Sequence, residues 1–232
     1  ISLEETFNKY PIPFTSNMIS DLFILVTIPF KETAFNNVTS VENYALKIGA
    51  INCLTKSGSN WIGKNTDWLG FLKPLTNFKK DTNTKITKAI VIGYGGASKA
   101  IIYALEKHGL SEIKVFNRTY KKMQKLKENK KIKKFELGEL KNHINEECVI
   151  INTTPTNPLK NINFRVNENS IGYDIVYKPK KTEFLSCFNE KKRIYGINML
   201  VYQAMLCFED WFGKLPPIDQ GLYNLLDKKL DL

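Results

Sequence analysis

The amino-acid sequence predicts an α/β protein in which a doubly wound parallel sheet is joined to a smaller α/β domain. Short β-branched runs alternate with helical patterns in the middle of the chain, and glycines lie where one such strand passes into a helix. The residues before position 80 show a different arrangement of predicted strands and helices. With 232 residues, 43% of them apolar and 25% charged, the chain is long enough for two domains and has a globular composition.

Two strands and one helix are predicted in the N-terminal third. Residues 22–28 and 51–55 are apolar, β-branched runs of strand length, and a helical pattern extends from Trp68 to about Leu75. We expect these elements to form a first, smaller domain over residues 1–80.

The middle of the chain contains a β-α-β unit with glycines at its first turn. Residues 89–92 form the first strand, a helical pattern of apolar residues then ends at Gly109, and residues 113–116 supply the next strand. Such a unit implies a right-handed parallel crossover. Further strands are predicted at residues 148–151 and 170–175.

A long helix is predicted near the C-terminus, at residues 198–212. Asn198 is a suitable residue to cap its start, and Gly213 is suited to end it. The last helices could pack on either domain. We expect the doubly wound domain to cover residues 81–198, and residues 199–232 to complete the first domain.

Three glycines, Gly93, Gly95 and Gly96, follow the first strand of the central unit. Glycines at this turn let the backbone approach a pyrophosphate, and the helix N-terminus offers unpaired N–H groups with a partial positive charge. The same residues would also suit a tight turn that only packs helix against strand. Because both strands and the helix have the right spacing, the sequence favours a Rossmann-type dinucleotide-binding domain.

The end of the second strand indicates which dinucleotide binds. Sites that prefer NAD usually carry Asp or Glu there for the ribose 2′-hydroxyl. This chain has Asn117, Arg118 and Thr119 instead. A guanidinium can pair with a 2′-phosphate in a forked geometry, so we expect NADP(H) to be the cofactor. A solvent-exposed arginine at the end of a strand is the simpler alternative.

The chain has a formal net charge of +11, which would suit a nucleic-acid-binding protein. Many of the lysines lie in residues 120–134, which read as an amphipathic helix with a solvated face followed by a basic turn. Arginines are few, and aromatic residues are not interleaved with the lysines. Nucleic-acid binding is therefore not expected.

Neither a membrane span nor a metal site is expected. The longest apolar run, residues 22–30, contains a Thr and a Pro and is well short of the ~20 residues that a spanning helix needs. The N-terminus as given has no basic stretch followed by an apolar one. The four cysteines are scattered without a CxxC pair, which favours a reduced, cytoplasmic setting.

A hydride-transferring enzyme needs a group that exchanges a proton with its substrate. His108 ends the helix of the β-α-β unit and His143 lies in a polar segment, so neither is a convincing candidate. Lys31, after a Val-Thr-Ile-Pro-Phe run, and Asp67, in GKNTDWLGF, are better ones. Taken alone, the lysine could be solvated, and Asp67 could cap the following helix, with Asn65 or Thr66 sharing that task.

Several separated segments together resemble the shikimate dehydrogenase family. They occur in the family's order and span nearly the whole chain, which makes the resemblance specific. The segments are VTIPFKE around Lys31, GAINCL (49–54), GKNTDWLGF (63–71), GYGGASKA (93–100), NRT (117–119), GYDIVYKPKKTEFL (172–185) and GINMLVYQAMLCFEDWFG (196–213).

The resemblance implies a role for individual residues. Lys31 and Asp67 would form the acid–base pair beside the substrate hydroxyl. Asn152 and Thr153, in INTTP, look like a family segment near the cofactor, although a plain strand-end turn explains them equally well. Substrate contacts are implied for Thr27, Asn52, Tyr177 and Gln203. Cofactor contacts are implied for Gly93, Gly95, Gly96, Ala97, Asn117, Arg118, Thr119, Gly196 and Met199.

The implied activity is the reversible, NADPH-dependent reduction of 3-dehydroshikimate to shikimate in aromatic amino-acid biosynthesis. A related hydroxy acid such as quinate is an alternative substrate. A non-catalytic, NADP-binding relative or fragment is the alternative outside the enzyme class. We expect a monomer or a homodimer.

Three departures from the family pattern stand out. Family members begin with a strand and a Ser-x-Ser-Pro motif that holds the substrate carboxylate, and the residues before VTIPFKE contain no such motif. We expect either that the chain is a piece of a longer protein or that the carboxylate is held differently. Leu25 stands where the family usually has Asn, and Asn198 stands where many members have glycine.

Overall fold

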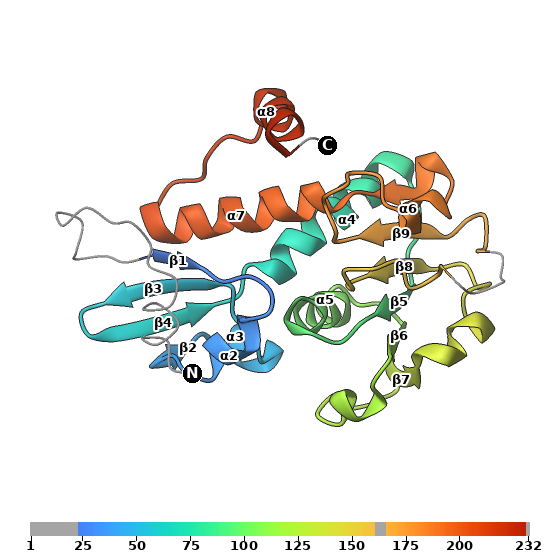
Figure 1. Ribbon diagram of the computed structural model, residues 1–232, viewed down its shortest axis with the longest axis horizontal. Helices are drawn as coiled ribbons and strands as arrows, with labels where there is room; N and C mark the ends of the chain where they lie inside the picture. Colours follow the sequence, from blue (N-terminus) through green and yellow to red (C-terminus); the bar gives the residue numbers. More distant parts are fainter. Residues whose placement is uncertain (1–22, 161–165, 231–232) are drawn as a thin grey trace.

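Two β-sheets organise the part of the chain that the computed structural model describes, residues 23–160 and 166–230. A six-stranded sheet and a four-stranded sheet lie side by side, with helices between them and around them (Figure 1). This arrangement confirms the predicted α/β class with a doubly wound parallel sheet and a second, smaller sheet. Thr15 and Ser16, two hydroxyl-bearing residues before VTIPFKE that do not form the Ser-x-Ser-Pro motif, lie outside the described residues.

The larger sheet is parallel throughout, and its strand order is β7-β6-β5-β8-β9-β10. The chain enters at the central strand β5, builds outward to β7 and returns to β8 on the other side of β5. The order therefore reverses between β5 and β8, where the carboxyl ends of the strands leave a crevice for a ligand. The strands are β5 (Lys88–Ile92), β6 (Glu112–Asn117), β7 (Ile132–Glu136), β8 (Val149–Asn152), β9 (Ile171–Asp174) and β10 (Arg193–Ile194).

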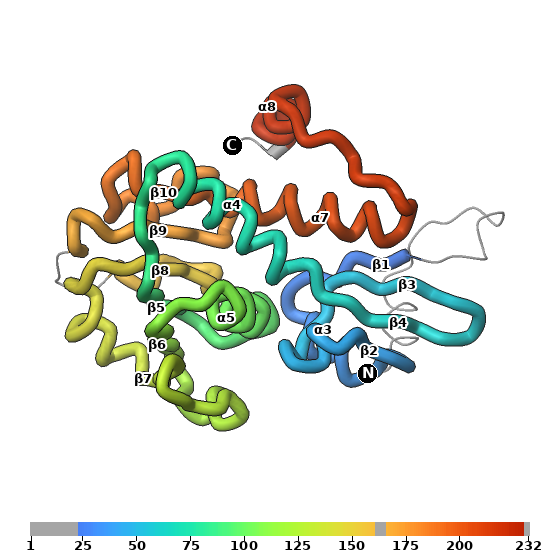
Figure 2. The backbone as a smooth tube through the Cα atoms, turned by 180° about the vertical axis from the view of Figure 1, so that it is seen from behind, coloured from blue at the N-terminus to red at the C-terminus, as the bar shows by residue number. Residues whose placement is uncertain are grey.

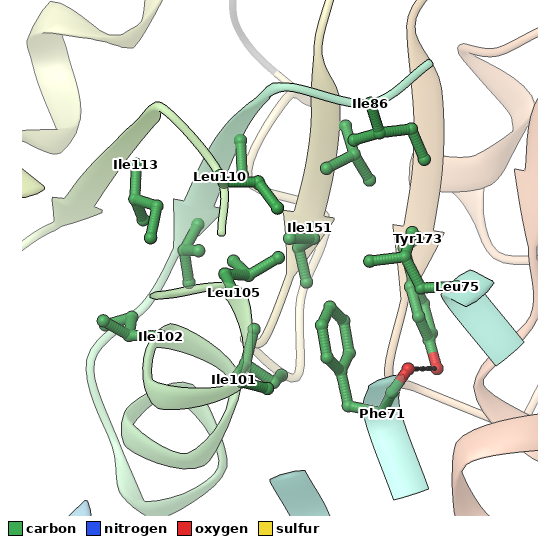
Figure 3. Close-up of a cluster of buried hydrophobic side chains, with 14 of the residues drawn as sticks. Phe71, Leu75, Ile86, Ile101, Ile102, Leu105, Leu110, Ile113, Ile151 and Tyr173 are labelled. Carbon is green, nitrogen blue, oxygen red and sulfur yellow. Dashed lines mark hydrogen bonds between the residues drawn. The ribbon is translucent and has the colours of Figure 1, made fainter. Parts of the chain in front are cut away.

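Helices α4 (Asp67–Thr82) and α5 (Gly96–Lys107) cover one face of this sheet. Figure 3 shows their apolar side chains meeting the strands, with Phe71 stacked on Tyr173 and the Tyr173 hydroxyl donating to the Phe71 carbonyl at 3.4 Å. The other face packs against α6 (Glu183–Ser186) and the 3-10 segment η2 (Leu137–Asn142). Two further 3-10 segments are η1 (Tyr120–Met123) and η3 (Glu190–Lys192).

The smaller sheet has the order β1-β3-β4-β2, and only the β4-β2 pair is parallel. Its core includes Val26, Ala34, Ala45, Ile51 and Leu54, which are buried between the sheet and two short helices. The elements are β1 (Phe23–Leu25), α2 (Lys31–Phe35), β2 (Ser40–Val41), α3 (Asn43–Ile48), β3 (Cys53–Ser57) and β4 (Asn60–Lys64).

Helix α7 (Gly196–Phe212) crosses from the larger sheet to the smaller one and packs along α4, as the two views show (Figures 1 and 2). The two helices are in tight contact at Gly70, where a Cβ atom would lie 2.6 Å from Cβ of Gln203. Only glycine permits this crossing, because a methyl group there would overlap the opposite backbone. Helix α8 (Gln220–Leu230) follows. In the described part of the chain, no helix has the length and apolar character that crossing a membrane requires.

The prediction of an amphipathic helix at residues 120–134 is wrong. The segment begins with the 3-10 turn η1 and ends in strand β7, which pairs in parallel with β6. Met123 and Ile132 are buried, as an inward-facing apolar side would require, but the two residues do not lie on one helix. The free edge of β6 offers backbone hydrogen bonds to this segment, a tertiary effect that outweighs its helical pattern.

Other predicted boundaries shift by a few residues. The predicted strand at 22–28 is described only over β1, and Leu22 lies outside the described residues. Helix α4 continues to Thr82, well past Leu75. Asn198 does not cap the C-terminal helix: α7 begins at Gly196 with Tyr195 as N-cap, so Asn198 lies within its first turn.

Candidate active site

A pocket of about 120 Å³ lies between the two sheets. One ordered water needs only ~10–15 Å³ on this measure, so the pocket has room for a small molecule. Its wall brings together segments that are far apart in the sequence: the turn after β1, the starts of α2, α4 and α5, the chain after β9, and α7. The predicted site residues on this wall are Thr27, Lys31, Asp67, Ala97, Tyr177, Gly196, Met199 and Gln203.

The Lys31 ammonium donates to the Asp67 carboxylate, with Nζ 2.6 Å from Oδ2. Lys31 is the first residue of α2, and its carbonyl accepts from the Ile51 amide at 3.1 Å. Asp67 is the first residue of α4 and is almost completely buried. Asp67 is therefore not the N-cap of its helix: Thr66 holds that position, and Asn65 Oδ1 accepts from the Trp68 amide at 3.4 Å.

Asn52 does not reach the pocket wall and is fully buried behind it. Its Nδ2 donates to Gln203 Oε1 at 2.9 Å and to Thr66 Oγ1 at 2.8 Å, while its Oδ1 accepts from the Thr66 amide at 2.6 Å. Gln203 Nε2 donates to the Leu200 carbonyl at 2.9 Å. This network fixes the Gln203 side chain, so Asn52 acts on the pocket through its neighbour.

The glycine turn fits a dinucleotide. Gly93 has φ +107°, a conformation that favours glycine, and a Cβ there would lie 2.4 Å from Thr153 Oγ1. At Gly95, the N-cap of α5, a Cβ would meet no atom within 4 Å, so the backbone is open to a ligand. The first N–H groups of α5 have no partners within the helix. Gly96, in contrast, faces Lys31 at the start of α2: a Cβ on Gly96 would lie 2.8 Å from Cβ of Lys31.

Arg118 lies at the carboxyl end of β6, and among the described residues it has no acidic partner within ion-pair distance. It lines a second, open hollow of about 380 Å³ at the same edge of the sheet. Asn117 Nδ2 donates to the Thr119 carbonyl at 2.9 Å, which shapes the chain around Arg118. The other lining residues are Glu136, Leu137, Gly138, Asn157, Pro158 and Lys160.

Asn152 and Thr153 lie at the end of β8, beside the reversal in strand order. Asn152 is buried, and its Nδ2 donates to Asp174 Oδ1 at 3.1 Å and to the Thr154 carbonyl at 3.2 Å. Its amide is therefore used within the protein. Thr153 Oγ1 donates to the Ile92 carbonyl at 2.7 Å and lies 2.6 Å from Ser98 Oγ, so it supports the glycine turn from below.

Asp174 is a buried residue beside the pocket that the sequence analysis did not single out. It accepts from Thr182 Oγ1 at 2.6 Å and from the Val176 amide at 3.0 Å. Burial raises the pKa of this carboxyl above its ordinary value, despite these hydrogen bonds. The sequence did offer a signal for Asp174, because this residue lies in GYDIVY, three residues before the predicted site residue Tyr177. The pocket wall also includes Leu25, so the residue that replaces the family's usual Asn does face the site.

The histidines take no part in the pocket wall. His108 Nε2 lies 3.0 Å from Lys79 Nζ, and burial together with this cation lowers the pKa of His108. His143 packs against Phe116 and Phe135, and burial lowers its pKa as well. Lys31 and Asp67 are therefore the ionisable pair that the pocket presents.

The doubly wound sheet, its open glycine turn and a pocket with a partly buried lysine–aspartate pair define a nicotinamide-nucleotide-dependent oxidoreductase of two α/β domains. Residues 76–168 match the family model described as Shikimate / quinate 5-dehydrogenase. The shikimate dehydrogenase (NADP(+)) of Dictyoglomus thermophilum is 35% identical over 204 residues, a match that covers 84% of this chain and 73% of that protein. The chain belongs to the shikimate dehydrogenase family.

Solved structures agree with this assignment. Shikimate dehydrogenase from Aquifex aeolicus is 33% identical with a TM-score of 0.70, covering 92% of this chain and 77% of that one. Shikimate 5-dehydrogenase from Thermus thermophilus, in complex with NADP(H) and shikimate, is 29% identical with a TM-score of 0.69, covering 84% of this chain and 74% of that one.

Proposed function

We propose that this protein catalyses the reversible, NADPH-dependent reduction of 3-dehydroshikimate to shikimate, a step of aromatic amino-acid biosynthesis. The observation that carries the proposal is the Lys31–Asp67 ion pair, which lines the same pocket as the start of α7. Membership of the shikimate dehydrogenase family supplies the substrate and the cofactor class.

NADPH, when bound, supplies the hydride for the substrate ketone. Lys31 donates a proton to the oxygen that becomes negatively charged as the hydride arrives, and it accepts that proton back in the reverse direction. Asp67 holds the ammonium by its hydrogen bond and accepts from the adjacent substrate hydroxyl. Because both groups are largely shielded from water, their interaction is stronger than it would be on the surface.

The substrate is held by polar groups around this pair. Thr27 and Tyr177 are exposed at the mouth of the pocket, and Gln203 reaches it from α7. Asn52 contributes by fixing the Gln203 amide, which costs no reorganisation when the substrate binds. Leu25 adds an apolar contact at the position where the family usually has Asn.

NADPH would bind at the carboxyl edge of the larger sheet, where the strand order reverses. Gly93, Gly95, Gly96 and Ala97 would hold its pyrophosphate at the start of α5. Thr153 supports this turn from beneath, and Asn152 would contribute to the cofactor site from the end of β8. Arg118, between Asn117 and Thr119, would pair with the 2′-phosphate and so select NADPH over NADH. Gly196 and Met199, on the first turns of α7, line the same pocket as Lys31 and would contact the nicotinamide.

The proposal includes a division of labour between domains. Residues 1–80, completed by residues 199–232, bind the substrate, and residues 81–198 bind NADPH. The four cysteines are free thiols, which suits a reducing cytoplasm. We propose a monomer or a homodimer, because the pocket is formed within one chain.

The test follows NADPH absorbance after 3-dehydroshikimate is added to the purified chain, with NADH as the cofactor control. Rapid oxidation that is selective for NADPH would support the proposal. NADPH binding without turnover would refute it and favour a non-catalytic relative. Comparing the oxidation of shikimate with that of quinate in the reverse direction identifies the preferred hydroxy acid.

A further inference from the structure

A second ion pair joins the helix that begins with Lys31 to the helix that begins at the glycine turn. Lys99 Nζ, in the first turns of α5, donates to Glu32 Oε2 on α2 at 2.5 Å. Glu32 directly follows Lys31 in the chain. The pair therefore connects α5, which begins at the candidate cofactor-binding turn, to α2, which carries the candidate proton donor Lys31.

Two further contacts show how closely α2 and α5 are fitted. A Cβ on Gly96 would lie 2.8 Å from Lys31 Cβ and 3.5 Å from Lys31 Cδ, so the aliphatic stem of Lys31 lies directly on the start of α5. The Lys99 ammonium also lies 5.6 Å from the centre of the Tyr94 ring, within the glycine turn itself. Lys99 thus contacts both Glu32 on α2 and Tyr94 in the glycine turn.

The ion pair restricts movements of α2 that the contact between Lys31 and Gly96 still allows. Contact between the Lys31 stem and Gly96 sets how near α2 can come to α5, but a smooth contact does not prevent sliding. The directional bond from Lys99 to Glu32 opposes sliding and rotation of the short helix α2. Since Lys31 is the first residue of that helix, its Nζ is aimed at Asp67 only while α2 keeps this position.

We propose that Glu32 and Lys99 are positioning residues that hold Lys31 in line with the substrate and the cofactor. This inference rests on the proposed function and deepens it. The Glu32 side chain is 44% exposed, so the pair adds little to the stability of the fold, and its effect is on geometry. Misplacing a catalytic group by about 1 Å can lower the rate ~100-fold.

The test uses Glu32→Gln, Lys99→Met and the exchanged pair Glu32→Lys/Lys99→Glu. We expect each single variant to lower kcat by about 10- to 100-fold with unchanged NADPH affinity, and the exchanged pair to recover most of the loss. Matched controls are Glu128→Gln and Lys134→Met, an ion pair of 3.5 Å at the outer strand β7. Neither control should change kcat.

Acetylation of Lys31 by acetic anhydride, followed by peptide mass spectrometry, gives a readout that does not need turnover. Lys31 should react faster in both single variants and slowly again in the exchanged pair, because a displaced ammonium loses the protection of Asp67. An inactive wild-type chain would refute the proposed function, and this measurement would still decide the positioning role.

Three results would overturn the inference. One is unchanged kcat and unchanged Lys31 acetylation in both single variants. Another is weakened NADPH binding in Lys99→Met alone, which would make Lys99 a direct cofactor ligand. The last is an exchanged pair that recovers neither kcat nor the protection of Lys31.

Discussion

Lys31 Nζ lies 2.6 Å from Asp67 Oδ2, although 36 positions separate the two residues in the chain. Each is the first residue of its helix, α2 or α4, and hydrogen bonds tie both segments to the loop before β3. The Ile51 amide donates to the Lys31 carbonyl at 3.1 Å, and Asn65 Nδ2 donates to the Ala50 carbonyl at 2.8 Å. The 50–51 segment thus acts as a shared support for both catalytic candidates.

Lys31→Ala should lower kcat by about 10²- to 10⁴-fold with little change in NADPH affinity, because it removes the proposed proton donor and leaves the glycine turn intact. Steady-state kinetics with 3-dehydroshikimate and NADPH binding by fluorescence measure the two effects. Lys47→Ala, an exposed lysine in the last turn of α3, is the control. Wild-type turnover in Lys31→Ala would remove this residue from the mechanism.

Arg118→Ala should lower kcat/KM for NADPH by about 10- to 100-fold, the loss expected for hydrogen bonds to a charged group, and leave the value for NADH nearly unchanged. The ratio of the two values is the measurement. Lys130→Ala removes the same charge from an exposed turn and should not alter the ratio. An equal loss with both cofactors would mean that Arg118 has a structural role.

Gly70→Ala should lower the free energy of unfolding by about 1–3 kcal/mol, as expected for overpacking. A Cβ at this position would lie 2.8 Å from the Gln203 amide nitrogen and 2.9 Å from its Cα, so α4 and α7 must separate. Urea denaturation measures the loss, and kcat should fall as well because Gln203 moves. In Gly138→Ala the new methyl group meets no atom within 4 Å, and stability should not change.

Asp174→Asn should alter how stability depends on pH. Burial raises the pKa of Asp174 above its ordinary value of 3.8, so the folded state holds this proton more tightly than the unfolded state does. Its contribution is therefore fully present below pH 3.8 and is lost as the pH rises through the raised pKa.

The free energy of unfolding of Asp174→Asn, relative to that of the wild type, should therefore increase from acid to neutral pH. Urea titrations across this range measure the difference. Asp81→Asn, at the exposed end of α4, serves as the comparison. A constant difference between wild type and Asp174→Asn would contradict the raised pKa.

Local sequence was sufficient for much of the larger sheet. The β-branched runs that became β5, β6, β8 and β9 are buried on both faces, and such strands read as short apolar runs whatever their neighbours. The glycine turn was equally legible, because the φ of +107° at Gly93 strongly favours a residue without a side chain.

Segments whose structure depends on a distant part of the chain could not be predicted from their local sequence. Residues 132–136 became a strand because β6 offers a free edge, and Asn198 lost its predicted capping role because α7 begins at Gly196, packed against the carbonyls of Asp174 and Val176. Neither cause can be seen in the local pattern, since hydrogen bonds and close contacts between distant segments decide both.

By itself, the sequence determined the fold class, the dinucleotide turn and the candidate residues Lys31, Asp67 and Arg118. Only the tertiary structure decided that Lys31 and Asp67 form one ion pair, that Asn52 lies behind Gln203, and that Glu32 meets Lys99. The physical reason is range: backbone conformation and burial leave a local pattern in the chain, whereas a hydrogen bond between distant residues exists only once the helices have packed.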